Sequence, residues 1–434
     1  MKKKFVMTVL ATTVAASMAM GAQAEEADPV FNIPDDFIVL HVGESVSMDD
    51  ITVDNLPEGA KVRFAYTDGS VAHVYNTTNE LTGFRTGLSD IVVEVYQPLA
   101  MGVDADGNRY VTPEETLATS EPIRVTVVPA ERENAGIKLG VQMFNFFFDS
   151  SQDGDAVTLL RELASMGYDG VEWFARSANY EDKTVMGLPY EEMKSIMDEL
   201  GLESAGLHNA GGMLDNASST EPGTVNEESV ANVIEFCEAM DIGRVWVETS
   251  FPGTASAPAE MDKYTPEEME AIVEVVNQQY DLYQPYFEGT GITMMYHNHA
   301  EMYQMPDGSF ALSKIKFANQ IDYYWAVKGL GATSTIGQEN SQAEALAFIQ
   351  DVAENTVSLH MKDGTDNYMV NNDYASWGQG EFDIQSILDI GRAYDNIEWI
   401  IVENDGASGV NGGSVEDARL SAMYADTLDF SKID

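Results

Sequence analysis

The sequence predicts a two-part α/β protein, in which a small all-β sandwich precedes a (β/α)8 TIM barrel. Strand-like and helix-like segments alternate eight times between residue 137 and the end of the chain. Residues 28–129 contain short runs of alternating apolar and polar residues, separated by Gly, Asp, Asn and Pro. In addition, His, Asp or Glu side chains stand at the ends of four successive predicted barrel strands.

The first 24 residues have the pattern of a signal peptide. Lys2, Lys3 and Lys4 precede an apolar stretch, and a small-x-small sequence at 22–24 comes before the acidic Glu25. The sequence contains no later run of about 18 apolar residues, so we expect no membrane insertion after cleavage. The expected location of the mature protein is the periplasm or the exterior of the cell.

The chain is strongly acidic, with a formal net charge of −49 at pH 7. Such a surface repels nucleic acid and anionic lipid, and it disfavours highly phosphorylated substrates. The single cysteine, Cys237, excludes an intrachain disulfide. The composition therefore argues against nucleic-acid and anionic membrane partners, and the sequence leaves open whether the protein forms a homo-oligomer.

The expected strands of the first part are residues 37–41, 61–66, 72–75, 91–96 and 123–128. A polar segment near 129–135 separates this part from the barrel at 137–434. The order of Val42-Gly43-Glu44-Ser45, the run from Asp68 to Val74, the run from Leu81 to Gly87 and Ile123-Arg124-Val125-Thr126-Val127 resembles bacterial immunoglobulin-like domains. The resemblance implies a spacer or adhesion module.

One acidic loop in this part, Asp104 to Glu115, permits two interpretations. Oxygen donors stand at positions 1, 3, 5 and 12, as in a calcium-binding EF-hand loop. However, Arg109 occupies the position where that loop needs glycine. An Asp-Gly hairpin turn is therefore the favoured interpretation, and a calcium site is the alternative.

In the barrel, the expected strands are 139–144, 170–174, 204–208, 244–248, 292–297, 321–327, 357–360 and 399–403. The expected helices are 156–166, 190–200, 226–240, 266–287, 342–354, 384–394 and 415–428, with a short helix at 311–318 between the fifth and sixth strands. A doubly wound open sheet is the alternative, but no glycine-rich dinucleotide fingerprint follows the first strand.

Four residues at the ends of strands five to eight predict a metal site: His297, Asp322, His360 and Glu403. A parallel barrel brings the ends of its strands together at one mouth. Imidazole and carboxylate donors suit a divalent metal such as Mn²⁺, Mg²⁺, Co²⁺ or Zn²⁺.

Several motifs are similar to those of xylose isomerase-like sugar isomerases and epimerases. They are Leu163 to Glu172 (LASMGYDGVE), Tyr296 to His299 (YHNH), Asp322 to Gly329 (DYYWAVKG), Leu359 to Asp363 (LHMKD), Gly378 to Asp383 (GQGEFD) and Ile401 to Gly406 (IVENDG). The resemblance implies a metal held by four residues, commonly Glu, Asp, His and Glu. Asp322, His360 and Glu403 match the last three, whereas His297 stands where many epimerases have Glu. Dehydratase-like and lyase-like relatives also carry a histidine-rich fifth strand, which favours proton abstraction with elimination.

By the same resemblance, further residues have implied roles. Glu403 is expected to be a ligand and a base, His299 a proton relay, and Lys362 a contact to a substrate oxygen. Glu172 and His208 are expected to bind substrate hydroxyls or to act as a second acid or base. As alternatives, His208 can be a hydrogen-bonded residue of the barrel rim, Glu172 can cap a loop, and His299 can bond within its loop. Trp325 and Lys328, in the sixth-strand motif, are expected to bind substrate, and packing is the alternative for the tryptophan.

Three functions follow from these observations. The first is an exported, metal-dependent isomerase or epimerase acting on an unphosphorylated sugar, with proton abstraction next to a carbonyl or hydroxyl. The second is a lyase or dehydratase of the same fold, acting on keto-sugars or oxidised glycosides. The third is a non-enzymatic carbohydrate-binding surface protein, against which the retained Asp322, His360 and Glu403 argue.

Overall fold

The structure is a computed structural model, and it describes residues 27–75, 78–103, 108–130, 132, 135–147, 155–252, 263–331, 341–365, 373–410 and 412–433. The predicted signal peptide at 1–24 lies outside these residues, so export stays a prediction. In the described part of the chain, no helix is both long enough and apolar enough to span a membrane.

The described chain divides into two compact units, and the described residues of the first lie within 27–36, 48–65 and 92–122. Its described strands form antiparallel pairs and a three-stranded sheet in the order β12-β9-β5. Arg63 on β5 bonds to Glu94 on β9 at 2.7 Å and to Glu114, which precedes β12, at 2.6 Å. The strands of this unit are β1 (Val30–Asn32), β4 (Thr52–Asp54), β5 (Lys61–Tyr66), β9 (Ile91–Gln97), β10 (Ala100–Val103), β11 (Arg109–Thr112) and β12 (Glu115–Thr119).

The acidic loop connects two antiparallel strands, as the hairpin interpretation predicts. Val103 at the end of β10 pairs with Arg109 at the start of β11. An EF-hand would instead place a helix on each side of the loop. Residues 104–107 lie outside the described part of the chain, so the calcium site stays an untested prediction.

The second unit comprises residues 37–47, 66–91 and 123–434. Before the barrel it contains two three-stranded sheets, in the orders β2-β13-β8 and β3-β7-β6. These strands agree with the prediction of a small all-β region, and the immunoglobulin-like assignment stays a prediction. The strands are β2 (Phe37–His41), β3 (Ser45–Ser47), β6 (Ala72–Tyr75), β7 (Glu80–Gly83), β8 (Gly87–Leu88) and β13 (Arg124–Val128).

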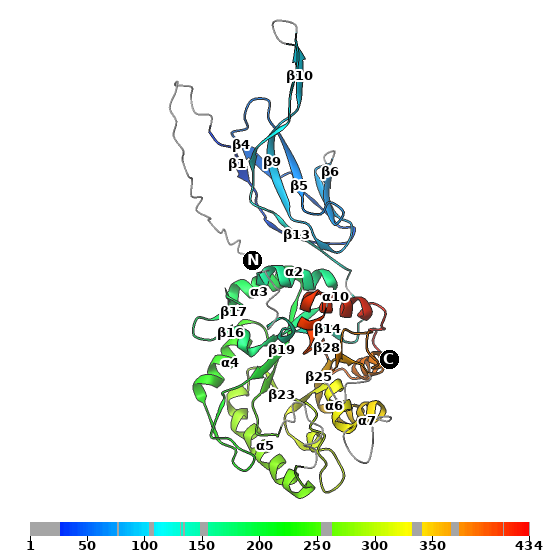
Figure 1. Ribbon diagram of the computed structural model, residues 1–434. Helices are drawn as coiled ribbons and strands as arrows, with labels where there is room; N and C mark the ends of the chain where they lie inside the picture. Colours follow the sequence, from blue (N-terminus) through cyan, green and yellow to red (C-terminus); the bar gives the residue numbers. More distant parts are fainter. Residues whose placement is uncertain are drawn as a thin grey trace. The chain divides into compact units, whose positions relative to one another are not determined.

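The predicted TIM barrel is confirmed, because eight strands close in the order β14-β15-β19-β22-β23-β24-β25-β28. Every neighbouring pair is parallel, including the closing pair β14 and β28. The strands are β14 (Lys138–Gln142), β15 (Gly170–Phe174), β19 (Glu203–Ala210), β22 (Arg244–Val247), β23 (Thr293–His297), β24 (Ala318–Asp322), β25 (Thr356–Met361) and β28 (Trp399–Val402). Figure 1 shows helices surrounding these strands.

The helices begin where capping groups satisfy their first backbone N–H groups. The Asp155 side chain accepts from Thr158 N at the start of α2, and Thr265 and Glu268 form a capping box at the start of α5. The helices are α1 (Phe144–Phe147), α2 (Ala156–Met166), α3 (Tyr190–Leu200), α4 (Glu227–Ala239), α5 (Pro266–Phe287), α6 (Tyr323–Gly331), α7 (Ser341–Val352), α9 (Ile384–Ala393) and α10 (Gly413–Ala425), with 3-10 turns at Ala175–Ser177, Ala311–Lys314, Ala353–Asn355 and Ala407–Gly409.

Two predicted strands were too long. The sixth was expected to run to residue 327, but it ends at Asp322 and helix α6 begins at Tyr323. The Asp322 carboxylate accepts a hydrogen bond from Trp325 N at 2.9 Å, which caps the helix and explains the early end of the strand. The first strand likewise ends at Gln142, and Phe144 opens the short helix α1. Remaining short strands are β16 (Ala178–Asn179), β17 (Thr184–Val185), β18 (Leu188–Pro189), β20 (Leu214–Asp215), β21 (Thr224–Val225), β26 (Asp363–Gly364) and β27 (Tyr374–Ala375).

A close backbone approach on β15 requires glycine at position 170. A Cβ added to Gly170 would lie 2.3 Å from the Glu203 carbonyl oxygen and 2.7 Å from the ring of Trp399. We therefore expect Gly170→Ala to lower the free energy of unfolding by about 1–3 kcal/mol, the usual cost of overpacking. Urea denaturation would measure this, with Gly243→Ala as control because nothing lies within 4 Å of its added Cβ. Equal stability of the two variants would contradict the prediction.

Candidate active site at the mouth of the barrel

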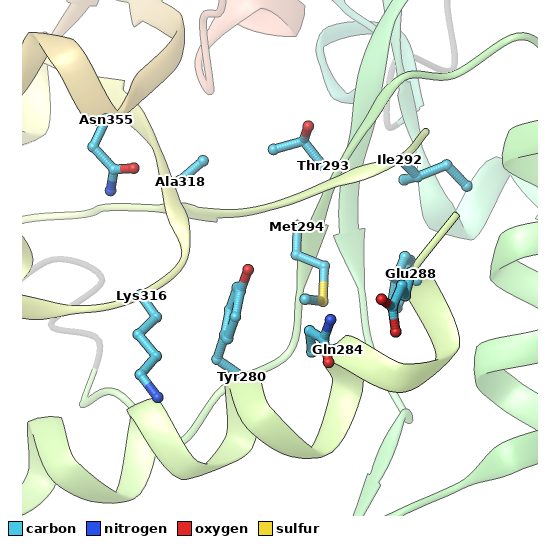
Figure 2. Close-up of a pocket in the computed structure, with 10 residues that line it drawn as sticks. Tyr280, Gln284, Glu288, Ile292, Thr293, Met294, Lys316, Ala318 and Asn355 are labelled. Carbon is cyan, nitrogen blue, oxygen red and sulfur yellow. The ribbon is translucent and has the colours of Figure 1, made fainter. Parts of the chain in front are cut away.

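The candidate site lies at the C-terminal ends of the barrel strands, where TIM-barrel enzymes place their active sites. A separate cavity of about 340 Å³ lies at the opposite end of the strands, between α5 and the starts of β23 and β24 (Figure 2). Its charged lining residues are Glu288 and Lys316, and the lysine bonds to Asp281 at 2.7 Å. This cavity holds no predicted site residue.

Strand register brings the predicted metal-binding residues together. His297 is level with Gln320 on the next strand, and Asp322 is level with His360. Asn298 links the ends of β23 and β24, because its side chain accepts a hydrogen bond from Asp322 N at 2.8 Å and donates one to Asp322 O at 3.2 Å. The YHNH and DYYW motifs therefore form one hydrogen-bonded corner of the mouth.

The four predicted metal-binding residues form one buried group. His297, Asp322, His360 and Glu403 each offer a ligand atom, and these atoms all lie within 4.8 Å of one another. All four residues are at most 4% exposed. Their types and spacing fit a divalent metal.

A buried lysine lies between the two carboxylates of this group. Lys362 Nζ is 2.5 Å from Asp322 Oδ2 and 2.5 Å from Glu403 Oε2. Burial lowers the pKa of Lys362, but attraction to Asp322 and the neighbouring carboxylates raises it well above the ordinary value. Lys362 therefore carries a positive charge where the predicted metal would meet its carboxylate ligands.

His360 lies between two carboxylates. Its Nδ1 is 2.5 Å from Glu403 Oε2, and its Nε2 is 2.9 Å from Glu172 Oε2. Burial lowers the pKa of His360, but attraction to Glu172 and Glu403 outweighs it and raises the pKa to about 10. Burial raises the pKa of Glu172, and electrostatic attraction to His360 and His208 reverses this and lowers the pKa to about 2.

Gln320, which the sequence analysis missed, joins two of the predicted residues. His297 Nδ1 donates to Gln320 Oε1 at 3.1 Å, and Gln320 Nε2 donates to Glu172 Oε1 at 2.5 Å. Burial and repulsion by His360 lower the pKa of His297 well below 6.5, so this imidazole is neutral. Strand alternation could have identified Gln320, because it stands two residues before Asp322 and so faces the same side.

Two tryptophans flank the histidines. The Trp246 ring centroid lies 4.5 Å from that of His208, and the Trp325 centroid lies 5.5 Å from that of His299. Burial and the nearby charge of Lys362 lower the pKa of His299 to about 3, which makes it neutral at physiological pH. Lys328 Nζ lies 5.3 Å from the Trp325 centroid. Trp325 and Lys328 both belong to helix α6, and their substrate-binding role stays a prediction.

The Asp363 carboxylate organises a loop and contacts none of the predicted metal ligands in the described hydrogen bonds. Its carboxylate accepts from the backbone N–H groups of Gly364, Gly378, Gly380 and Phe382, at 2.8 to 3.2 Å. A Cβ on Gly380 would lie 2.1 Å from Asp363 Oδ1, which explains the glycine. The LHMKD and GQGEFD motifs are thus two halves of one structural element.

Asp405 is a further carboxylate near Lys362, and no role was predicted for it from the sequence. It lies 3.9 Å from Lys362 Nζ, and burial raises its pKa to about 6.

The structure brings together seven of the predicted site residues through direct contacts or shared neighbours. They are Glu172, His208, His297, Asp322, His360, Lys362 and Glu403. His299 adjoins them through its ring contact with His297, and Lys328 lies against Trp325.

Comparison with known proteins agrees with this architecture. Residues 160–424, more than half of the chain, match the family described as "Xylose isomerase-like TIM barrel". A search among curated proteins returned no match.

Several solved structures are similar to the chain. A sugar phosphate isomerase/epimerase from Parabacteroides distasonis is 18% identical, with 70% of this chain and 98% of that one covered and a TM-score of 0.49. An IOLI protein with a binding zinc atom is 13% identical, with coverages of 67% and 97% and a TM-score of 0.45. The 3-keto-D-glucoside 4-epimerase from E. coli is 15% identical, with coverages of 67% and 99% and a TM-score of 0.44.

The position of Lys362 predicts a strong effect on stability. In metal-free protein, we expect Lys362→Met to lower the free energy of unfolding by about 3–5 kcal/mol, because two buried carboxylates lose their partner. Urea denaturation in the presence of a chelator measures the loss. The control is Lys316→Met, which breaks the exposed pair with Asp281 and should cost less than about 1 kcal/mol. Equal losses would refute the assigned charge pairing.

Proposed function

The chain belongs to the xylose isomerase-like TIM barrel family, and from that premise we propose that it is a divalent-metal-dependent sugar isomerase or epimerase. The substrate is an unphosphorylated sugar that loses a proton from the carbon next to a carbonyl or hydroxyl. The observation that carries the proposal is the convergence of His297, Asp322, His360 and Glu403 within 4.8 Å at the mouth of the barrel.

A bound divalent metal would polarise the substrate oxygen and so acidify the neighbouring C–H. The buried Lys362 ammonium adds a second positive charge, which stabilises negative charge developing on a substrate oxygen. Glu172 and Glu403 are the proposed proton-transfer groups, and they lie on opposite nitrogens of His360. The neutral His299, beside Trp325, is the proposed relay.

The proposed substrate carries no phosphate, and the proposed location is the periplasm or the cell exterior. The formal charge of −49 disfavours polyanions. The predicted signal peptide would carry the chain to a compartment where unphosphorylated sugars prevail.

His297 supports a second candidate, a lyase or dehydratase acting on keto-sugars or oxidised glycosides. The fifth strand contributes this neutral imidazole where a two-glutamate epimerase would place a carboxylate. Proton abstraction by a single carboxylate followed by loss of a leaving group needs no second base on the opposite face. An unsaturated product, detected by its ultraviolet absorbance, would identify this reaction.

Solvent-proton exchange tests the function directly. Unphosphorylated aldoses, ketoses and keto-glycosides would be incubated with metal-loaded protein in D₂O, and deuterium next to the carbonyl would be followed by NMR. We expect exchange that a chelator abolishes and that Glu403→Gln slows by at least about 100-fold, the contribution of a positioned base. The control is Glu398→Gln, whose side chain is 57% exposed and bonds to Arg244. Sugar binding without exchange would instead support a carbohydrate-binding protein.

Metal binding should depend on pH. Because the pKa of His360 is raised to about 10 in the metal-free protein, a metal that binds this imidazole must displace its proton. The apparent affinity should therefore rise about tenfold per pH unit between pH 6 and pH 8. Competition with a chelator of known pH dependence measures this slope. A flat profile would show that His360 is already neutral or is not a ligand.

A further inference from the structure

Four buried polar atoms at the mouth have no well-aligned hydrogen-bond partner among the described residues. They are His208 Nδ1, His297 Nε2, His360 Nε2 and Glu172 Oε2. All four side chains are at least nine-tenths buried, with His208 the most exposed at 6%. Leaving buried polar atoms without partners is costly, so such a cluster indicates a missing ligand.

These atoms lie close together. Glu172 Oε2 is 3.2 Å from His208 Nδ1 and 2.9 Å from His360 Nε2. The three histidines each offer a ring nitrogen within 4.8 Å of the other two. Donors placed 2.0–2.1 Å from a tetrahedral zinc ion lie about 3.3 Å apart, so small side-chain rotations would close the shell.

The opposite atoms of three of these side chains are already held in place. His297 Nδ1 donates to Gln320, and Gln320 in turn donates to Glu172 Oε1. His360 Nδ1 donates to Glu403 Oε2, because a carboxylate can only accept. Metal-binding histidines typically donate a hydrogen bond from the nitrogen that does not bind the metal, and this bond orients the other nitrogen toward the ion. In His297 and His360 the donating nitrogen is Nδ1, and Nε2 is the nitrogen left for the ion.

The donor set predicted from the sequence is less open. Asp322 Oδ2 and Glu403 Oε2 are both engaged by Lys362 at 2.5 Å, and Asp322 Oδ1 caps helix α6. Asp322 Oδ2 also lies 4.0 Å from His297 Nε2, farther than adjacent tetrahedral donors. An ion using this set would have to displace the lysine.

We propose that the metal ion is held by His208, His297 and His360, with Glu172 as the fourth donor, a role that replaces the proton transfer proposed for Glu172 above and leaves Glu403 as the base. Glu403 and Gln320 then orient ligands instead of binding the ion, and Lys362 keeps its place beside Asp322. This inference rests on the proposed metal-dependent function and specifies the ion. Three imidazoles favour Zn²⁺ or Co²⁺ over Mg²⁺, which prefers oxygen donors.

Zinc binding to the full chain tests the donor set. The zinc X-ray absorption spectrum of the unsubstituted protein counts the imidazole ligands without any risk of misfolding. Affinities of the His208→Gln, Glu172→Gln and Asp322→Asn variants would be measured by competition with a chelator. The control is His73→Gln, because His73 packs against Tyr66 and Tyr75 in the all-β region and belongs to neither set. Circular dichroism would confirm that each variant is folded.

We expect three imidazoles in the spectrum, a loss of zinc affinity of at least about 100-fold in His208→Gln, and a change below about fivefold in Asp322→Asn. Mg²⁺ in large excess should not displace the zinc. Two imidazoles, with affinity lost in Asp322→Asn and kept in His208→Gln, would overturn the inference and leave the proposed function standing. Absence of zinc binding to the unsubstituted protein would overturn the inference, and absence of Mn²⁺, Co²⁺ and Mg²⁺ binding as well would overturn the proposed function.

Discussion

The compensation of buried charge at the mouth of the barrel is the constraint on which the site depends. Lys362, Asp322, His360, Glu172 and Glu403 are all at most 4% exposed. An isolated ion in such surroundings would be prohibitively unstable, so each charge needs a partner. Lys362 forms ion pairs with Asp322 and Glu403, and His360 forms ion pairs with Glu172 and Glu403. The alternation of charges fixes the rotamers of side chains that come from four different strands.

The backbone supports this arrangement by giving some residues two roles. Asp322 caps helix α6 with one oxygen and bonds to Lys362 with the other, so the end of β24 and the start of the helix determine where its charge lies. Asp363, next to Lys362 in sequence, accepts hydrogen bonds from four backbone N–H groups, one of Gly364 and three of the loop after β27. The chain therefore holds its site through main-chain bonds as well as ion pairs, which gives the preorganisation that catalysis requires.

Much of this organisation could be predicted from the sequence. Strand and helix alternation identified the closed barrel, and the strand-end pattern identified His297, Asp322, His360 and Glu403 as neighbours. Other features depend on side-chain packing. Nothing in the chain order shows that Lys362 reaches between two carboxylates or that Gln320 joins His297 to Glu172. The predicted sixth strand was also too long, because Tyr323 to Val327 are apolar and aromatic, which favours a strand. In the structure these residues form a helix, whose first turn is capped by the bond from Trp325 N to Asp322.

A crystal structure of the full chain soaked in Zn²⁺, with anomalous differences recorded at the zinc edge, most directly tests a metal-centred site at this mouth. The account predicts one strong peak, bounded by the ring nitrogens of His208, His297 and His360 and by Glu172, with Lys362 still paired to Asp322. No peak at the mouth, in crystals whose zinc is bound only on the acidic surface, would contradict the central claim.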